Sequence, residues 1–450
     1  MKKRFHAATV WSAAALMTAF TPAFAAPAAE PVTGWVQEGE DWCFYDSDGY
    51  KLTDSWKKED GNWFYLDEDG AVAFDRQIDE YYVGSDGKRV SDQWVSVENT
   101  DSWGSDDAPE FYWYYYGKDG KATVSRFKNI EDKTYYFDSE GRMAVGLTEI
   151  DGASYYFGGD GDGAMRKGWV ELDAEDYDNY EDESVWSYFD ASGKRVENQI
   201  DRKISGGYYS FEDGIMVTGW YRLPAVSKAT ASNAQAGSAA ESRPVSAAGY
   251  QYYDADGRRA NGWRTIEGIE GLSEEDELFK FYFKSGQPYY AETGIQVFTT
   301  NSGKYGFNTK GEMQTGLQQV TLADGTLANF YFGDDGAMKT GKQSIFDEES
   351  DMTRTWFFHN EGEKRGQGYH GILDGKVIYE NGLRKEADAE LRYAPVTFEG
   401  KQYLVNASGT IQKASASSRS ASRPELGAGF RDMKDANDTI WTVNTDGVIQ

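Results

Sequence analysis

The sequence predicts an all-β protein, an elongated β-solenoid of stacked β-hairpin repeats of about 20 residues each. Aromatic residues make up 15% of the 450 residues, and many of them fall in short triplets. An Asp-Gly or similar turn follows most triplets, with glycines such as Gly120, Gly141 and Gly163 recurring at intervals of about 21 residues. The triplets suit the two-residue periodicity of strands, and helical periodicity is nearly absent.

Three segments, residues 134–147, 154–169 and 330–341, show the repeated unit most clearly. Each has an aromatic triplet, a glycine turn and a small or Met residue, and ends on a glycine or on Gly-Trp or Gly-Leu. Asp-Gly tolerates the positive φ of tight hairpin turns. Because a lone hairpin is marginal in water, we expect stacked hairpins to bury one another's aromatic rings.

The first 26 residues have the pattern of a secretory signal peptide. Lys2, Lys3 and Arg4 form a basic start, residues 7–20 are apolar, and Ala23-Phe24-Ala25 matches a cleavage site. The alternative is an uncleaved anchor, but the apolar run is too short to span a bilayer. We therefore expect an exported chain with no membrane span.

The remaining chain is expected to divide into two repeat arrays. A short leader (residues 27–33) precedes array 1 (34–223), and array 2 (250–412) becomes degenerate after about residue 369. Ala- and Ser-rich composition predicts linkers at 224–249 and 413–428, followed by a terminal partial repeat at 429–450. The first linker is interpreted as a hinge, with a surface loop as the alternative. Exposed end hairpins would carry free edges, which suggests dimerisation through terminal repeats.

Charge and composition exclude several classes of function. The net charge of -29 disfavours nucleic acids and other polyanions as ligands. A single cysteine, Cys43, excludes a disulfide scaffold. Neither His359 nor His370 has a partner at zinc spacing, and no catalytic or phosphate-binding motif is present, so we expect no cofactor. The acidic segment 173–183 lacks the spacing of a calcium loop, and we expect it to be a solvated loop, with calcium binding as the alternative.

The N-terminal units resemble bacterial cell-wall-binding repeats, a group that includes the choline-binding modules of surface proteins. The resemblance is carried by Gly34-Trp35 with Trp42-Cys43-Phe44-Tyr45, and by Trp56 with Trp63-Phe64-Tyr65. Later Tyr-Tyr-Phe units are similar to glucan-binding repeats of glucosyltransferases and to receptor-binding repeats of clostridial toxins. The resemblance implies a β-solenoid, a non-catalytic attachment role and ligand sites between neighbouring hairpins.

The same resemblance implies aromatic ligand sites. One candidate combines Trp35, Trp42 and Tyr65, and a second combines Trp56 and Trp63 with Tyr81 or Tyr82. Trp169 is a further candidate, in one of the later copies that keep Gly-Trp. Several ring faces can surround a quaternary ammonium, whereas a sugar would stack on one ring and hydrogen-bond to Asp or Asn.

Most copies depart from the choline-binding pattern. Gly146-Leu147 and Gly316-Leu317 have lost the tryptophan. Complete cages are therefore expected at few positions, mainly near the N-terminus, which favours sugar binding or a largely structural array.

The sequence thus predicts a secreted, non-catalytic protein at the cell wall or cell surface. Its expected partners are cell-wall polysaccharide, neutral glucan or choline-decorated teichoic acid. The alternative is a surface adhesin or structural spacer that recognises a host glycan or protein. An enzyme would need a separate domain, and no segment of about 100 residues falls outside the repeat pattern.

Overall fold

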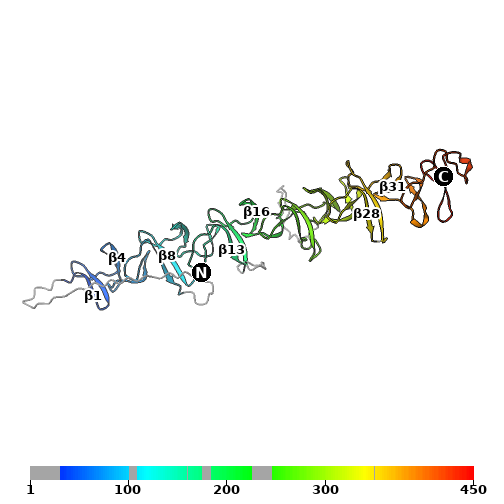
Figure 1. The fold of residues 1–450 in the computed structure, drawn as a ribbon. Helices are drawn as coiled ribbons and strands as arrows, with labels where there is room; N and C mark the ends of the chain where they lie inside the picture. Colours follow the sequence, from blue (N-terminus) through cyan, green and yellow to red (C-terminus); the bar gives the residue numbers. More distant parts are fainter. Residues whose placement is uncertain (1–30, 101–108, 160, 175–183, 225–245, 349) are drawn as a thin grey trace, which may run out of the picture. The chain divides into compact units, whose positions relative to one another are not determined.

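The structure, a computed structural model, describes residues 31–100, 109–159, 161–174, 184–224, 246–348 and 350–450. They form two units: unit 1 comprises Met1–Val170 and Phe189–Arg195, and unit 2 comprises Glu171–Tyr188 and Val196–Gln450. Antiparallel hairpins dominate each unit (Figure 1), which confirms the predicted all-β class. Among the described residues, no helix is long and apolar enough to cross a membrane.

Unit 1 consists of consecutive two-stranded hairpins, each joining a strand to the next one along the chain. The strands that lie wholly in this unit are β1 (Gly34–Glu38), β2 (Asp41–Tyr45), β3 (Ser55–Glu59), β4 (Asn62–Leu66), β5 (Arg76–Ile78), β6 (Tyr81–Val83), β7 (Gln93–Glu98), β8 (Phe111–Tyr116), β9 (Arg126–Ile130), β10 (Lys133–Phe137), β11 (Leu147–Ile150) and β12 (Ala153–Tyr156). The division between the units falls within β13 (Gly168–Asp173) and β14 (Ser184–Phe189).

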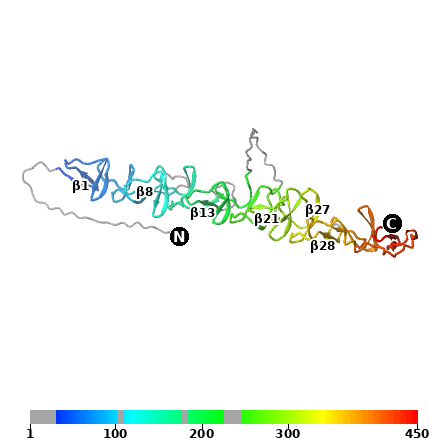
Figure 2. The same cartoon turned by 90° about the horizontal axis from the view of Figure 1, so that it is seen from above.

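Unit 2 repeats the hairpin with more additions. Short third strands extend some hairpins, and one sheet has five strands in the order β28-β29-β32-β31-β30. Figure 2 shows β21, β27 and β28 in chain order within this unit. Its elements are β15 (Gln199–Ile204), β16 (Gly207–Glu212), β17 (Ile215–Met216), β18 (Gly219–Arg222), β19 (Tyr250–Tyr253), β20 (Gly262–Glu267), β21 (Leu278–Lys284), β22 (Gln287–Pro288), β23 (Ile295–Thr299), β24 (Lys304–Asn308), β25 (Met313–Gln314), β26 (Gly316–Thr321), β27 (Leu327–Phe332), β28 (Gly341–Asp347), β29 (Met352–Phe358), β30 (Gly371–Leu373), β31 (Val377–Glu380), β32 (Leu383–Arg384), β33 (Tyr393–Phe398), β34 (Lys401–Asn406), β35 (Arg431–Lys434) and β36 (Ile440–Val443), with the 3-10 helices η2 (Ala389–Leu391) and η3 (Pro424–Leu426).

The turn after many of the aromatic triplets is stabilised by one side chain. The Asp138 carboxylate, directly after the triplet of β10, accepts hydrogen bonds from the backbone N–H groups of Glu140 (3.0 Å) and Arg142 (2.7 Å). Asp or Asn makes the same pair of bonds two and four residues ahead at Asp46, Asp67, Asp190, Asp254, Asn308, Asn406, Asp435 and Asn444. Side chains that bond to their own backbone in this way stabilise turns.

Backbone hydrogen bonds connect each turn to the preceding hairpin of the same unit. In unit 1, Val72 N–H donates to the Trp42 carbonyl (2.9 Å) and Met143 N–H to the Trp113 carbonyl (2.7 Å). In unit 2, Met338 N–H donates in the same way to the Lys304 carbonyl (2.9 Å). Successive repeats are therefore joined by main-chain bonds as well as by side-chain packing.

The last residue of many aromatic triplets forms the core between hairpins. Phe137 and Phe157 in unit 1 and Phe332 and Phe358 in unit 2 are all 0% exposed. The first residue of a triplet lies on the same face and is also buried, as at Tyr135 and Phe330, whereas the middle residue, such as Tyr136 or Tyr331, remains partly accessible. This alternation along the strand separates rings that hold the stack together from rings that reach the surface.

The two predicted linkers differ in how much of each the structure describes. Most of the first, residues 225–245, lies outside the described residues, but Trp220 and Tyr252 on either side are paired directly in one hairpin. Residues 413–428 are described, and Ser420 within them is only 3% exposed. The acidic segment 173–183 lies almost entirely outside the described residues.

Close backbone packing in the five-stranded sheet leads to a stability prediction. A Cβ atom added at Gly368 would lie 2.4 Å from the Asn381 carbonyl oxygen and 2.7 Å from its carbon. Neither atom can move without distorting the sheet, so we expect Gly368→Ala to destabilise unit 2 by about 1–3 kcal/mol. Thermal unfolding of the purified chain measures this. Gly159→Ala is the control, because a Cβ there meets nothing within 4 Å; an equal effect of both changes would contradict the explanation.

Candidate functional site

The hairpins of unit 1 bring aromatic rings together in groups of three. Trp35 lies opposite Phe44 on the paired strands β1 and β2, with ring centroids 5.3 Å apart. Phe64 from the next hairpin lies 5.5 Å from Trp35, again edge to face. We call these three residues the Trp35 cluster. Edge-to-face packing of this kind is the preferred geometry of aromatic pairs.

The same arrangement recurs along the chain. Each group has one central ring near the start of the first strand of a hairpin. This ring contacts the ring opposite it on the second strand, and it also contacts a ring from the next hairpin. In unit 1 the further groups are Trp56–Tyr65–Tyr81, Trp94–Tyr115–Tyr135 and Phe127–Tyr136–Tyr155; in unit 2 they are Trp220–Tyr252–Phe281 and Trp263–Tyr282–Tyr305.

The structure groups the predicted site residues differently from the sequence. Phe64, and not Tyr65, is the next-hairpin ring beside Trp35, because Tyr65 points to the other side of β4 and contacts Trp56 at 5.2 Å. A change of one residue along a strand moves the side chain to the opposite face. Trp35 and Trp42 do line one pocket.

The remaining predicted residues lie at separate places. Trp56 contacts Tyr81 at 5.4 Å, whereas Tyr82 packs on Tyr116, which is only 1% exposed. Trp63 is half-buried, and the Arg89 guanidinium lies 5.7 Å from its ring centroid. Trp169 is half-buried on β13. These positions make Tyr81, and not Tyr82, the ring that joins the Trp56 group.

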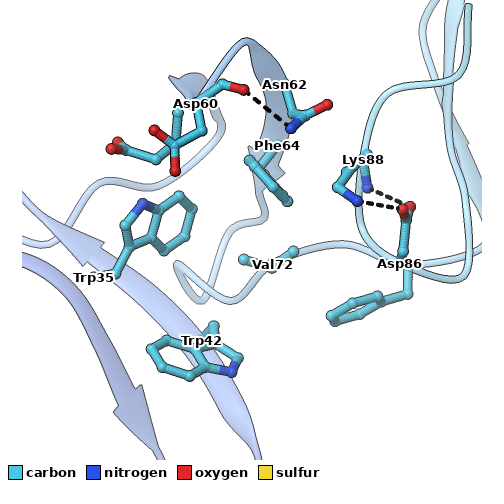
Figure 3. A pocket seen from close by; sticks show the side chains of 10 residues that line it. Trp35, Trp42, Asp60, Asn62, Phe64, Val72, Asp86 and Lys88 are labelled. Carbon is cyan, nitrogen blue, oxygen red and sulfur yellow. Dashed lines mark hydrogen bonds and ion pairs between the residues drawn. The ribbon is translucent and has the colours of Figure 1, made fainter. Parts of the chain in front are cut away.

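A pocket of about 860 Å³ opens between the first two hairpins of unit 1. Its apolar part consists of Trp35, Trp42, Phe64, Val72 and Phe74. Figure 3 labels the first four of these side chains. Trp42 is 45% exposed and Phe74 is 47% exposed, so two large ring faces are open to a ligand. Val72 N–H donates to the Trp42 carbonyl and thereby fixes the backbone that carries this ring.

Polar side chains surround the apolar part of the pocket. The tight turn Asp60-Gly61, with positive φ at both residues, places Asp60, Glu59 and Asn62 on one side. Asp86 and Lys88 lie on another side, where Lys88 Nζ donates to Asp86 at 2.8 Å (Figure 3). Desolvation alone would raise the pKa of Asp86, but the hydrogen bonds from Lys88 lower it below its ordinary value. Three carboxylates, one amide and one ammonium therefore border the open rings.

Sequence reasoning missed most of this polar border. Asp60, Asn62, Asp86 and Lys88 come from turns, and in the sequence they look like ordinary turn residues. Phe74 was missed because it lies outside the aromatic triplets. The available indication was that acidic turns recur at a fixed distance from aromatic triplets, which brings both kinds of side chain to one edge of the stack.

The arrangement can bind a ligand in two ways. An open indole or phenyl face can stack on the C–H face of a sugar while carboxylate and amide groups bond to its hydroxyls. A ring face beside carboxylates can also attract an ammonium group. In the part of the chain that the structure describes, no group of three or more His, Cys, Asp or Glu side chains is placed to hold a metal ion.

Cations of the chain itself already lie on several of these rings. Lys57 Nζ is 3.9 Å from the centroid of Phe44, and Lys128 Nζ is 5.7 Å from that of Tyr115. The Arg89 guanidinium is 4.9 Å from the centroid of Tyr81. On the Trp94 group, the Tyr115 hydroxyl also donates to Asp92 (2.6 Å), and this bond raises the pKa of Tyr115 to about 12.

Comparisons with known proteins agree with these features. The family model of the choline-binding repeat matches residues 32–76, which contain the Trp35 cluster, and residues 124–169. Glucosyltransferase-I of Streptococcus downei is 25% identical over 67% of this chain, and glucosyltransferase-S of Streptococcus mutans is 27% identical over 59%. The chain spans 18% of the length of each of these curated relatives.

Two solved structures from Streptococcus pneumoniae are also similar. The modular autolysin LytC is 18% identical, with 68% of this chain and 52% of that chain covered and a TM-score of 0.38. Choline binding protein F is 19% identical, with 85% and 100% covered and a TM-score of 0.28. The predicted resemblance to choline-binding repeats and to glucosyltransferases is confirmed; for the repeat it extends over residues 32–76 and 124–169.

Proposed function

We propose that this chain is a secreted, non-catalytic protein that binds neutral polysaccharide of a cell wall or cell surface through the pocket at Trp35 and Trp42. The observation that carries the proposal is the combination of two open rings, Trp42 and Phe74, with a border of Asp, Glu and Asn side chains. The repeat match supports the coarser statement of binding at a cell wall or surface.

The charge of the chain supports a neutral ligand. The net charge of -29 repels anionic polymers over the whole surface. Glu59, Asp60 and Asp86 place three carboxylates at the pocket itself, against the single ammonium of Lys88. Carboxylates accept hydrogen bonds from sugar hydroxyls, so the same groups that repel polyanions favour a neutral glycan.

We further propose that the hairpins continue as a solenoid. The bonds from each turn to the preceding hairpin, such as Arg89 N–H to the Trp63 carbonyl (2.7 Å), support this arrangement. A row of weak sites would bind a polymer multivalently, with a gain over a single site of about 10²–10⁴ where the spacing matches. Multivalent attachment explains the use of so many similar units.

Choline on teichoic acid is the second candidate ligand. The match of the choline-binding repeat model to residues 32–76 favours it, and the acidic border of the pocket would attract an ammonium group. Sedimentation of the mature chain with cell walls distinguishes the two, with choline and soluble neutral glucan as separate competitors. Release by glucan alone supports the proposal, release by choline alone supports the second candidate, and no sedimentation contradicts both.

Removing the exposed indole tests the pocket directly. We expect Trp42→Ala to weaken binding of a soluble neutral oligoglucan by about 5- to 30-fold, or about 1–2 kcal/mol, because the stacking surface is lost. Isothermal titration calorimetry of the full mature chain measures the affinity. Trp186→Ala is the control, since Trp186 is similarly exposed (41%) and lies outside this pocket. Equal losses in the two variants would contradict a specific role for Trp42.

A further inference from the structure

The ring groups of unit 1 that contain tryptophan have cations of the chain on their rings. Lys57 Nζ lies 3.9 Å from the Phe44 centroid in the Trp35 cluster, which is well within the range of cation–π attraction. Unlike Lys51, whose Nζ pairs with Glu38 at 2.9 Å, Lys57 forms no ion pair with any residue that the structure describes. The ring face is therefore the principal partner of this ammonium.

We propose that Lys57 is a specificity-determining residue. Its ammonium group occupies the position over the Phe44 ring that a ligand ammonium would take in the Trp35 cluster, and it thereby excludes quaternary ammonium ligands from this cluster. The inference deepens the proposed function and rests on it, because it concerns which ligand class the array selects. A ligand cation would have to displace Lys57 or sit beside a like charge, and either weakens its binding. A neutral glycan in the adjacent pocket meets no such penalty, since Lys57 does not line that pocket.

The strand register places a lysine at the same position in two hairpins of unit 1. Lys57 lies opposite Phe64, the next-hairpin ring of its cluster, and Lys128 lies opposite Tyr135, the next-hairpin ring of the Trp94 group. Both lysines reach back over the ring of the preceding hairpin, Phe44 and Tyr115 respectively. The same register position therefore delivers the same cation to two separate groups.

The hairpin itself does not require a charge at this position. The equivalent residues in other hairpins are Ile78 opposite Tyr81, Thr148 opposite Tyr155, and Gln343 opposite Trp356. Each forms a regular antiparallel pair without an ammonium group. We therefore expect that Lys57 can be replaced by Thr or Gln, residues that the chain uses at this position elsewhere, without loss of the fold.

The test is a titration of the full mature chain with free choline, followed by tryptophan fluorescence. We expect the wild-type chain to show no saturable response from the Trp35 cluster, and Lys57→Thr to gain choline affinity by at least about tenfold. Lys58→Thr is the matched control, because it removes the same charge from the same strand on the opposite face. Adding Trp35→Ala to Lys57→Thr should abolish the gain.

Two results would overturn the inference. One is a folded Lys57→Thr chain, judged by near-ultraviolet circular dichroism, with unchanged choline affinity; Lys57→Gln replaces it in the assay should the threonine variant not fold. The other is a wild-type choline response that Trp35→Ala removes. Neutral glucan binding is measured separately on the same proteins. Its absence from the wild-type chain would refute the proposed function and leave the choline gain of Lys57→Thr still measurable.

Discussion

Replacing Phe137 with alanine is expected to destabilise unit 1 by about 3–5 kcal/mol, since this ring is fully buried. Phe137 occupies the last position of its triplet and packs with Tyr115, Tyr135 and Met143 in one core cluster. It also lies 5.7 Å from the ring of Trp94 in the preceding hairpin. Its loss would leave a cavity between two repeats.

Urea unfolding, followed by circular dichroism of the purified chain, measures this effect. Phe111→Ala is the matched control, because it removes the same ring from unit 1 at a site that is 42% exposed. We expect its effect to be below about 1 kcal/mol. Similar losses of unfolding free energy in Phe137→Ala and Phe111→Ala would show that the buried ring contributes no more to stability than the exposed one. That result would contradict the core described for the repeats.

The hairpin repeat could be predicted from the sequence because its determinants are local. A triplet such as Tyr135-Tyr136-Phe137, with Asp138 and Gly141 after it, specifies strand, face and turn within seven residues. The role of Asp138 in accepting two backbone N–H groups was not predicted, although the sequence contains the residue at the right place. Local chemistry was thus sufficient for the fold class, whereas the hairpin turn lies before the triplet, between β9 and β10, and not at the Asp138–Gly141 turn that follows it.

The composition of the ring groups could not be predicted in the same way. Which of Phe64 and Tyr65 faces Trp35 depends on the rotation between successive hairpins, and no local pattern encodes that rotation. Either choice is consistent with the two-residue alternation of a strand. The pocket border has the same origin, because Asp60 and Asp86 belong to different repeats and meet only when those repeats stack.

Serines in the predicted linker at residues 413–428 make specific contacts with the hairpin that follows it. Its serines surround a single carboxylate: Asp432 on β35 accepts hydrogen bonds from the Ser420 hydroxyl, the Ser422 N–H (2.7 Å) and the Ser422 hydroxyl (2.8 Å). Thr442 on β36 donates a further bond at 2.9 Å. Composition alone does not indicate these contacts, because the acceptor belongs to a neighbouring hairpin.

Asp432→Ala is accordingly expected to destabilise the terminal hairpin β35–β36 by about 2–4 kcal/mol. The hydroxyls of Ser420 (3% exposed) and Thr442 (5% exposed) would lose a charged acceptor and remain buried without a replacement. Hydrogen exchange of the amides in both strands measures the local stability. Asp438→Ala is the control, because its carboxylate pairs with Lys434 at the surface and is 79% exposed; there we expect about 0–1 kcal/mol.

The same network predicts how this hairpin responds to acid. Desolvation would raise the pKa of Asp432, but the hydrogen bonds from Ser420, Ser422 and Thr442 outweigh it and lower the pKa below its ordinary value. A carboxyl group with a depressed pKa in the folded state stabilises that state above the unfolded pKa, about 3.9, and loses this contribution as the pH falls toward the folded value. The protection factors of the amides in β35 and β36, which are exchange rates corrected for the intrinsic pH dependence, should therefore fall below about pH 4 in the wild-type chain, and much less in Asp432→Asn, which cannot titrate. An equal fall in both chains would place the acid sensitivity elsewhere.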